Sequence, residues 1–137
     1  CLLVYNKSFE CRHLMELANL FPDLSEHLLA MVENTRDLLV PFRNGYYYLP
    51  AMGGSFSIKS VLPALFPDDP ELDYHLLDEI CQNGGQAMNL FPQLKDLSAE
   101  DELRARQALL NYCRLDTLAM VKLLEKLYDF VENEDDR

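Results

Sequence analysis

Long apolar runs and closely paired cysteines are absent from this sequence. No stretch approaches the roughly 18 consecutive apolar residues of a membrane-spanning helix, and the N-terminus has no basic region followed by an apolar segment and a cleavage site. None of the four cysteines lies in a C-x-x-C pair, which argues against a zinc ribbon and a disulfide framework. We therefore expect a soluble, cytoplasmic protein with reduced thiols and no membrane contact.

Basic residues are also scarce. The chain has 12 Lys and Arg against 23 Asp and Glu, a formal net charge of −11, whereas binding nucleic acid by charge alone requires an excess of Lys and Arg. The imbalance is uneven, because residues 61–137 carry most of the acidic groups. A phosphate-facing surface is therefore expected on residues 1–60, where Arg36, Arg43 and Lys59 are the candidates, or on sequence outside this chain.

The length and the apolar content fit one domain or a part of one. With 137 residues, 49% of them hydrophobic, the chain can bury a single core, and we assign residues 1–131 to it and residues 132–137 to a solvated acidic tail. The apolar run at 2–5 predicts a buried strand, and further short strands are expected at 38–40 and 46–49. Because a buried central strand needs neighbours on both sides, this supply of strands indicates a sheet truncated at its N-terminal side.

The rest of the chain has helical patterns. Apolar residues spaced by three and four predict helices over 8–20, from 23 or 25 to 32, over 57–62 and over 73–80. The strongest signal begins at Ser98, where three acidic residues in the first turn favourably oppose the helix dipole. It continues to Leu127, either unbroken or with one break near Asn111. The segment Asn83-Gly84-Gly85 is typical of a helix end. The predicted architecture is α/β, mostly helical with two or three short strands.

Polar residues follow the predicted first strand. Asn6 and Glu10 lie where this strand gives way to the first helix, and a carboxylate at the carboxyl end of a strand faces the crevice where open α/β sheets bind ligands. Glu10 is therefore a candidate site residue. The alternative, favoured if this segment stood alone, is that Asn6 or Ser8 caps the helix and Glu10 is an ordinary first-turn acid.

A second candidate lies on the last predicted helix. The four-residue spacing of Tyr112 and Asp116 puts a phenol and a carboxylate on one helix face, where the carboxylate can bind a hard divalent cation and the phenol can hold an attacking water. The same spacing occurs at Tyr74 and Asp78, so the pattern alone is weak. The alternative is a partly buried helical tyrosine beside a solvated acid.

Taken together, the two candidates resemble a known pair of motifs. N-x-x-F-E at residues 6–10 and Y-C-x-x-D-T at residues 112–117 resemble the second and third motifs of the DEDD exonucleases, the DnaQ-like branch of the ribonuclease H superfamily. More narrowly, the segments YNKSFE, GSFSIKSVLPAL and YCRLDTLAM are similar to a bacterial domain of unknown function found in predicted RecB-like nucleases. The resemblance covers nearly the whole chain and implies the C-terminal part of a ribonuclease H-like fold.

The resemblance also implies a catalytic role for three residues. Asp116 and Glu10 would bind metal, although the family usually has Asp at the second position, and Tyr112 would orient or help to deprotonate the attacking water, as in the tyrosine subclass. In the intact domain, four carboxylates would hold two Mg²⁺ or Mn²⁺ ions for phosphodiester hydrolysis. The first motif would be an Asp-x-Glu on the first strand, and no Asp-x-Glu occurs before residue 10. The chain is therefore expected to bind metal negligibly and to be inactive by itself.

Two functions are open at this point. The first is part of a 3'-5' exonuclease-type enzyme acting on DNA or RNA, with Asn6, Phe9 and Lys59 contacting the substrate. The second is a non-catalytic, acidic helical module that docks a partner or a companion nuclease domain in the same parent chain, which the net charge and the Glu at position 10 favour. An Asp-x-Glu on an upstream apolar strand would support the first. In either case, an unpaired edge of the first strand predicts a homodimer.

Overall fold

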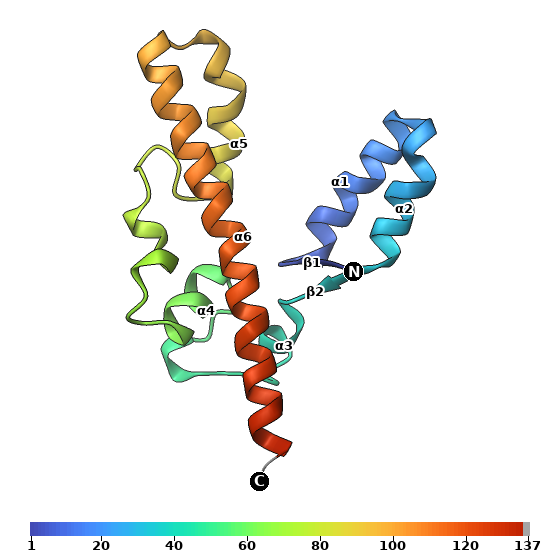
Figure 1. Ribbon diagram of the computed structural model, residues 1–137, viewed down its shortest axis with the longest axis vertical. Coiled ribbons are helices and arrows are strands. Elements are labelled where there is room, and N and C mark those ends of the chain that lie inside the picture. The colour runs from blue at the N-terminus through green and yellow to red at the C-terminus, as the bar shows by residue number, and fades with distance from the viewer. Residues whose placement is uncertain (136–137) are drawn as a thin grey trace.

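One long helix forms the spine of the molecule. The computed structural model describes residues 1–135, and Figure 1 shows α6, Ala99–Asp135, running along most of the length of the structure. The other elements are, in chain order, β1 (Leu2–Val4), α1 (Lys7–Leu20), α2 (Ser25–Glu33), β2 (Thr35–Asp37), α3 (Val40–Arg43), α4 (Ile58–Leu65) and α5 (Gly84–Gln93), with short 3-10 turns between some of them. No helix in this part of the chain is long and apolar enough to cross a membrane.

The predicted ribonuclease H-like α/β fold is wrong for this chain. In the described residues the sheet consists of β1 and β2 alone, paired in parallel, and the remainder is mostly helical. The strands expected at 38–40 and 46–49 do not form. The Asp37 side chain ends β2 in a turn by accepting the N–H of Leu39 (3.0 Å), and the first N–H groups of the second segment donate to the Pro41 carbonyl instead of to a neighbouring strand.

The predicted first strand is confirmed as β1, one residue shorter than expected. Leu2 lies opposite Thr35 and Val4 lies opposite Asp37, and of the three β1 side chains only Val4 is buried. Within the part of the chain that the structure describes, β1 has a neighbour on one edge and none on the other. Association through that edge, in a homodimer, stays a prediction.

Most of the predicted helices are confirmed. The segments 8–20, 25–32 and 98–127 form α1, α2 and α6, and the segment 57–62 forms the first part of α4. The helix expected over 73–80 is wrong, because Asp73 caps only a single 3-10 turn, Tyr74–Leu76. The segment Asn83-Gly84-Gly85 begins α5 rather than ending a helix, since the Asn83 side chain accepts the N–H of Gln86 (2.9 Å) as an N-cap.

The core lies between the middle of α6 and α4. The best buried residues of the two helices are Val61 and Leu62 from α4 and Leu115, Ala119 and Leu123 from α6. Full burial of each aliphatic side chain of this size contributes roughly 1.5–3 kcal/mol. This packing fixes the rotation of α6 about its axis. It therefore also fixes the direction in which Tyr112 and Asp116 point.

Candidate functional site

The site begins at the kink between β1 and α1. Asn6 has a left-handed backbone (φ 84°), a conformation that Asn tolerates better than most residues. Asp37, at the end of β2, accepts the N–H of Asn6 on one carboxylate oxygen (2.9 Å) and the N–H of Lys7 on the other (3.0 Å). Asp37 thus caps the start of α1 from the neighbouring strand and sets where the first turn of α1, including Glu10, lies.

Glu10 has a carboxylate oxygen without a partner. Its Oε2 is fully buried and accepts no hydrogen bond in the described residues, which is costly for an ionised acid. Burial raises the pKa of Glu10; a backbone hydrogen bond partly offsets this, and the charges of Asp37 and Asp116 raise the pKa further. The negative charges of two other acids, one on β2 and one on α6, thus add to the effect of burial on Glu10.

Asp116 lies between two tyrosines. The Tyr74 hydroxyl donates a hydrogen bond to Asp116 Oδ1 (2.5 Å), and the rings of Tyr74 and Tyr112 are 6.2 Å apart at an angle of 54°. Burial is the main cause of a raised pKa for both phenols, and the Asp116 carboxylate raises both further. Both tyrosines therefore keep their protons at neutral pH. These contacts bring Tyr74, Tyr112 and Asp116 together, and the predicted site that joins Glu10 to Tyr112 and Asp116 stays a prediction.

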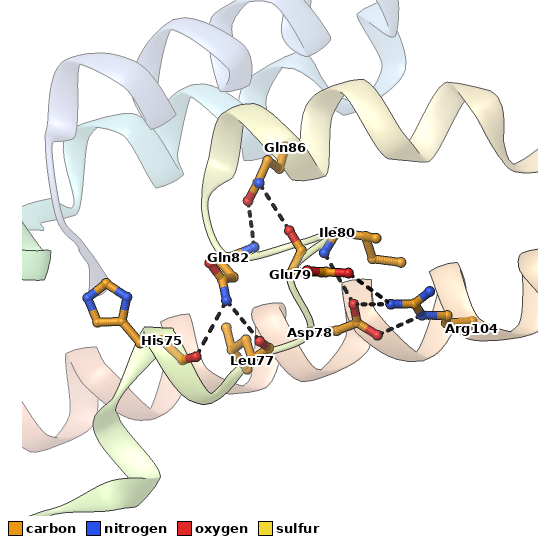
Figure 2. A network of polar contacts seen from close by, with 8 residues as sticks. All are labelled: His75, Leu77, Asp78, Glu79, Ile80, Gln82, Gln86 and Arg104. Atoms are coloured by element: carbon orange, nitrogen blue, oxygen red, sulfur yellow. Dashed lines mark hydrogen bonds and ion pairs between the residues drawn. The ribbon is translucent and has the colours of Figure 1, made fainter.

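The second tyrosine–aspartate pair of the sequence separates in space. Asp78 accepts hydrogen bonds from the Arg104 guanidinium, from Nε and Nη2, at 2.9 Å each, as Figure 2 shows. The hydrogen bond from Arg104 is the main reason why the pKa of Asp78 is lowered. Tyr74, on a 3-10 turn, points instead to Asp116. Asp78 is thus a surface ion-pair partner, whereas Tyr74 belongs to the candidate site.

Of the predicted substrate contacts, Lys59 lies beside Tyr74. Lys59 donates to the Gln82 carbonyl (3.0 Å), and its Nζ lies 5.7 Å from the centre of the Tyr74 ring. A cavity of about 80 Å³ adjoins them; its lining residues are Lys59, Pro63, Asp73, Tyr74, His75, Gln82 and Asn83. Phe9 is partly exposed, with its ring edge-on to His13, and the Asn6 side chain accepts the hydroxyl of Ser8 (2.7 Å). Substrate contact by Asn6, Phe9 and Lys59 stays a prediction.

The acids do not make a metal site by themselves. Among residues 1–135, no three His, Cys, Asp or Glu side chains come together in a way that could hold a metal ion. Both Asp37 oxygens already accept backbone N–H groups, which leaves Glu10 and Asp116 as the available donors. The expected two-ion site therefore does not fit the described residues alone.

Asp37 and Tyr74 were not predicted as site residues. A signal for Asp37 exists in the sequence, because an acid that ends a strand lies near other strand-end residues if the strands are parallel. Tyr74 has no such signal, since its place beside Asp116 depends on a non-helical turn that packs against α6 from far along the chain.

Comparisons with known proteins support part of the predicted resemblance. Residues 1–57 match the family described as a domain of unknown function (DUF2779). The chain is also similar to a protein of Mycoplasma pneumoniae (strain ATCC 29342 / M129 / Subtype 1), "Uncharacterized protein MG366 homolog", at 30% identity over 142 residues, which cover 96% of this chain and 21% of that protein. The chain thus spans about a fifth of the length of this relative. No solved structure matches. Similarity to a domain of unknown function is confirmed for residues 1–57, and neither description mentions a nuclease.

Proposed function

We propose that this chain supplies part of the active site of a metal-dependent nuclease, of the 3'-5' exonuclease type, that hydrolyses phosphodiesters of DNA or RNA. In this proposal Asp116 and Glu10 are ligands of Mg²⁺ or Mn²⁺, and Tyr112 is the phenol that orients the attacking water. The remaining ligands come from outside the described residues. By itself the chain is inactive.

The observation that carries the proposal is the unpartnered oxygen of Glu10. An ionised carboxylate with one buried, unpaired oxygen, and with the charges of two other acids acting on it, is unfavourable unless a proton or a cation balances its charge. Asp116 has one oxygen bonded to Tyr74 and can offer the other. A divalent cation between Glu10 and Asp116 would convert this repulsion into attraction, and hard cations prefer carboxylate oxygens.

The state of Tyr112 decides its chemical role. Since burial and the nearby Asp116 raise its pKa, the phenol is protonated at neutral pH and donates a hydrogen bond. A protonated phenol can orient a water or a phosphate oxygen but is a poor general base. Of the two roles that the resemblance implies, orientation is therefore favoured over deprotonation. Bound divalent ions would supply the activation of water and the stabilisation of the leaving oxygen.

The test uses the full-length protein that contains this chain. Mn²⁺-dependent degradation of end-labelled single-stranded DNA and RNA is measured for wild type, Asp116→Ala and Tyr112→Phe. We expect Asp116→Ala to abolish cutting and Tyr112→Phe to slow it about a hundredfold, within the range for positioned proton-transfer groups. The matched controls are Asp78→Ala, which removes a surface acid, and Tyr128→Phe, which alters an exposed tyrosine of the same helix. Equal activity in all five proteins would refute the proposal.

A second function is favoured by a separate observation. Exposed apolar side chains cover part of the α5–α6 hairpin, and the surface as a whole is acidic; the large exposed side chains are Met88, Phe91, Leu103 and Leu110. Clusters of exposed apolar residues commonly bind other proteins. A non-catalytic module that docks a partner or a companion nuclease domain would retain these features without any need for metal. Unchanged cutting by Asp116→Ala, together with loss of cutting when the whole chain is deleted, would support this function.

A further inference from the structure

Tyr74 approaches Asp116 from a different part of the chain than Tyr112 does. Tyr112 lies on α6, one helical turn before Asp116, whereas Tyr74 lies on the 3-10 turn Tyr74–Leu76. Tyr74 is the more buried of the two phenols, with 6% of its surface exposed. Its hydroxyl donates to Asp116 Oδ1 at 2.5 Å, a short distance typical of a hydrogen bond to a charged acceptor.

The turn that carries Tyr74 is held on both sides. Asp73 accepts the N–H of His75 (2.8 Å) and so caps the turn at its start. After the turn, the Gln82 amide donates to the carbonyl oxygens of Leu77 (3.0 Å) and His75 (3.4 Å), and Figure 2 shows how these bonds draw residues 75–82 into a compact loop. A donor on such a braced loop is already oriented toward its acceptor, so little ordering is needed.

The same loop is also fastened to α5. The Gln86 side chain accepts the N–H of Gln82 (2.7 Å) and donates to the carbonyl of Glu79 (3.2 Å). The Lys59 ammonium lies over the Tyr74 ring, 5.7 Å from the ring centre. Tyr74 is therefore fixed by the hydrogen bonds of its loop, by the contact of its ring with Lys59 and by the hydrogen bond of its hydroxyl. Tyr112 is only half-buried and remains accessible to a ligand.

We propose that Tyr74 is a positioning residue that fixes the orientation of the Asp116 carboxylate, so that the Tyr112 hydroxyl can turn from Asp116 to a water or a phosphate oxygen when substrate binds. This inference rests on the proposed nuclease function. The two tyrosines beside Asp116 then have different roles. The buried Tyr74 orients the carboxylate, and the half-buried Tyr112 contacts the substrate. Without Tyr74, Asp116 would keep its charge but lose its fixed direction.

The first test asks whether the hydrogen bond orients Asp116, with no need for activity. In the 137-residue chain, Tyr74→Phe should lower Tm by about 4 °C in the wild-type background and should leave Tm unchanged or raise it in the Asp116→Ala background, because the hydroxyl then has lost its acceptor. Tyr5→Phe is the matched control. It also removes a tyrosine hydroxyl that donates a hydrogen bond, here to the Phe56 carbonyl, and its effect should be the same in both backgrounds. An equal loss for Tyr74→Phe in both backgrounds would overturn the inference.

The second test asks whether the orientation matters for the reaction. In the full-length protein, Tyr74→Phe should lower kcat about tenfold and leave KM within about twofold, as expected for lost orientation of a catalytic group. Tyr5→Phe should leave both constants unchanged. If Tyr74→Phe kept the wild-type kcat while Tyr112→Phe and Asp116→Ala lost theirs, the positioning role would be wrong and the nuclease proposal would stand. If Asp116→Ala were also fully active, both would be wrong.

Discussion

Two segments of this chain carry a tyrosine and an aspartate four residues apart, and they use them in opposite ways. At residues 112–116 the backbone is helical, so that Tyr112 and Asp116 lie on one face and interact with each other. At residues 74–78 the backbone is a 3-10 turn followed by extended chain, so that Tyr74 and Asp78 point to different partners. The same spacing brings two side chains together only where the backbone is an α-helix.

The environments of the two aspartates differ as much as their geometry. Asp116 is partly buried and accepts a hydrogen bond from a buried phenol, whereas Asp78 pairs with Arg104, whose side chain is half exposed. A hydrogen bond made in a buried place contributes more than an exposed ion pair, because water competes with the exposed pair. Asp116 should therefore contribute more than Asp78 to the free energy of unfolding.

The largest expected difference is between Asp116→Ala and Asp78→Ala. The first substitution leaves the buried Tyr74 hydroxyl without its acceptor, which should lower the free energy of unfolding by about 2 kcal/mol. The second removes a surface pair, and Tm should change by roughly a degree. Urea denaturation and thermal melting of the two variants measure this directly. Similar losses in both variants would mean that the two segments are equivalent and that Tyr74 is not a partner of Asp116.

A smaller effect should come from Glu10, whose pKa responds to the charge of Asp116 and not to that of Asp78. Burial, with the charges of Asp37 and Asp116, raises the pKa of Glu10, so the folded state favours its protonated form. The contribution of Glu10 to the stability of the folded state is therefore fully present below the ordinary Glu pKa. It is lost as pH rises through the raised pKa of the folded state. Glu10→Gln imitates the protonated acid. Its Tm should exceed that of wild type at about pH 7 and match it at about pH 4.

The matched control for this pH dependence is Glu79→Gln. Glu79 belongs to the exposed segment, with 86% of its side chain accessible and its carboxylate 3.9 Å from Arg104. We expect its Tm to follow that of wild type at both pH values. A gain in Tm for Glu79→Gln equal to that for Glu10→Gln would attribute the effect to the overall negative charge, and not to the three acids at the site.

Local patterns predicted the elements well and the architecture poorly. Amphipathic spacing predicted α1, α2 and α6 because each of these helices buries one face. The fold class was wrong because it relied on strands at 38–40 and 46–49, where side-chain and turn hydrogen bonds from Asp37 and to Pro41 compete with strand pairing.

Cap residues were the other source of error. Asn83 precedes two glycines, a pattern typical of a helix end, yet its side chain accepts the N–H of Gln86 and begins α5. Asn is favoured at both ends of helices, so the residue type alone does not decide the direction. Asp73 shows the reverse case, since it caps a turn that does not continue into a helix.

The sequence indicated those candidate site residues that belong to a local motif. Glu10 follows a strand, and Tyr112 and Asp116 share a helix face, so each motif was visible by itself in the sequence. Tyr74 was not visible, because its contact with Asp116 joins two segments that only the packing of the loop against α6 brings together. Long-range partners of this kind depend on the fold, which spacing does not encode.

The smallest expected effect is at Arg104, and it separates the two segments by their response to salt. Arg104→Gln removes the guanidinium that lowers the pKa of Asp78. Because the pKa of Asp78 is lowered, its ionised form stabilises the folded state at pH values above the ordinary Asp pKa. This stabilisation is lost as pH falls through the lowered pKa. The Tm of Arg104→Gln should therefore lie slightly below that of wild type at neutral pH and should equal it in acid. Because the pair is exposed, about 1 M NaCl should also abolish the difference. Tyr74→Phe provides the contrast, since the loss of a buried hydrogen bond should persist in the same salt. A salt-resistant loss for Arg104→Gln would show that the Asp78 segment is held as firmly as the Asp116 segment, and the distinction between them would fail.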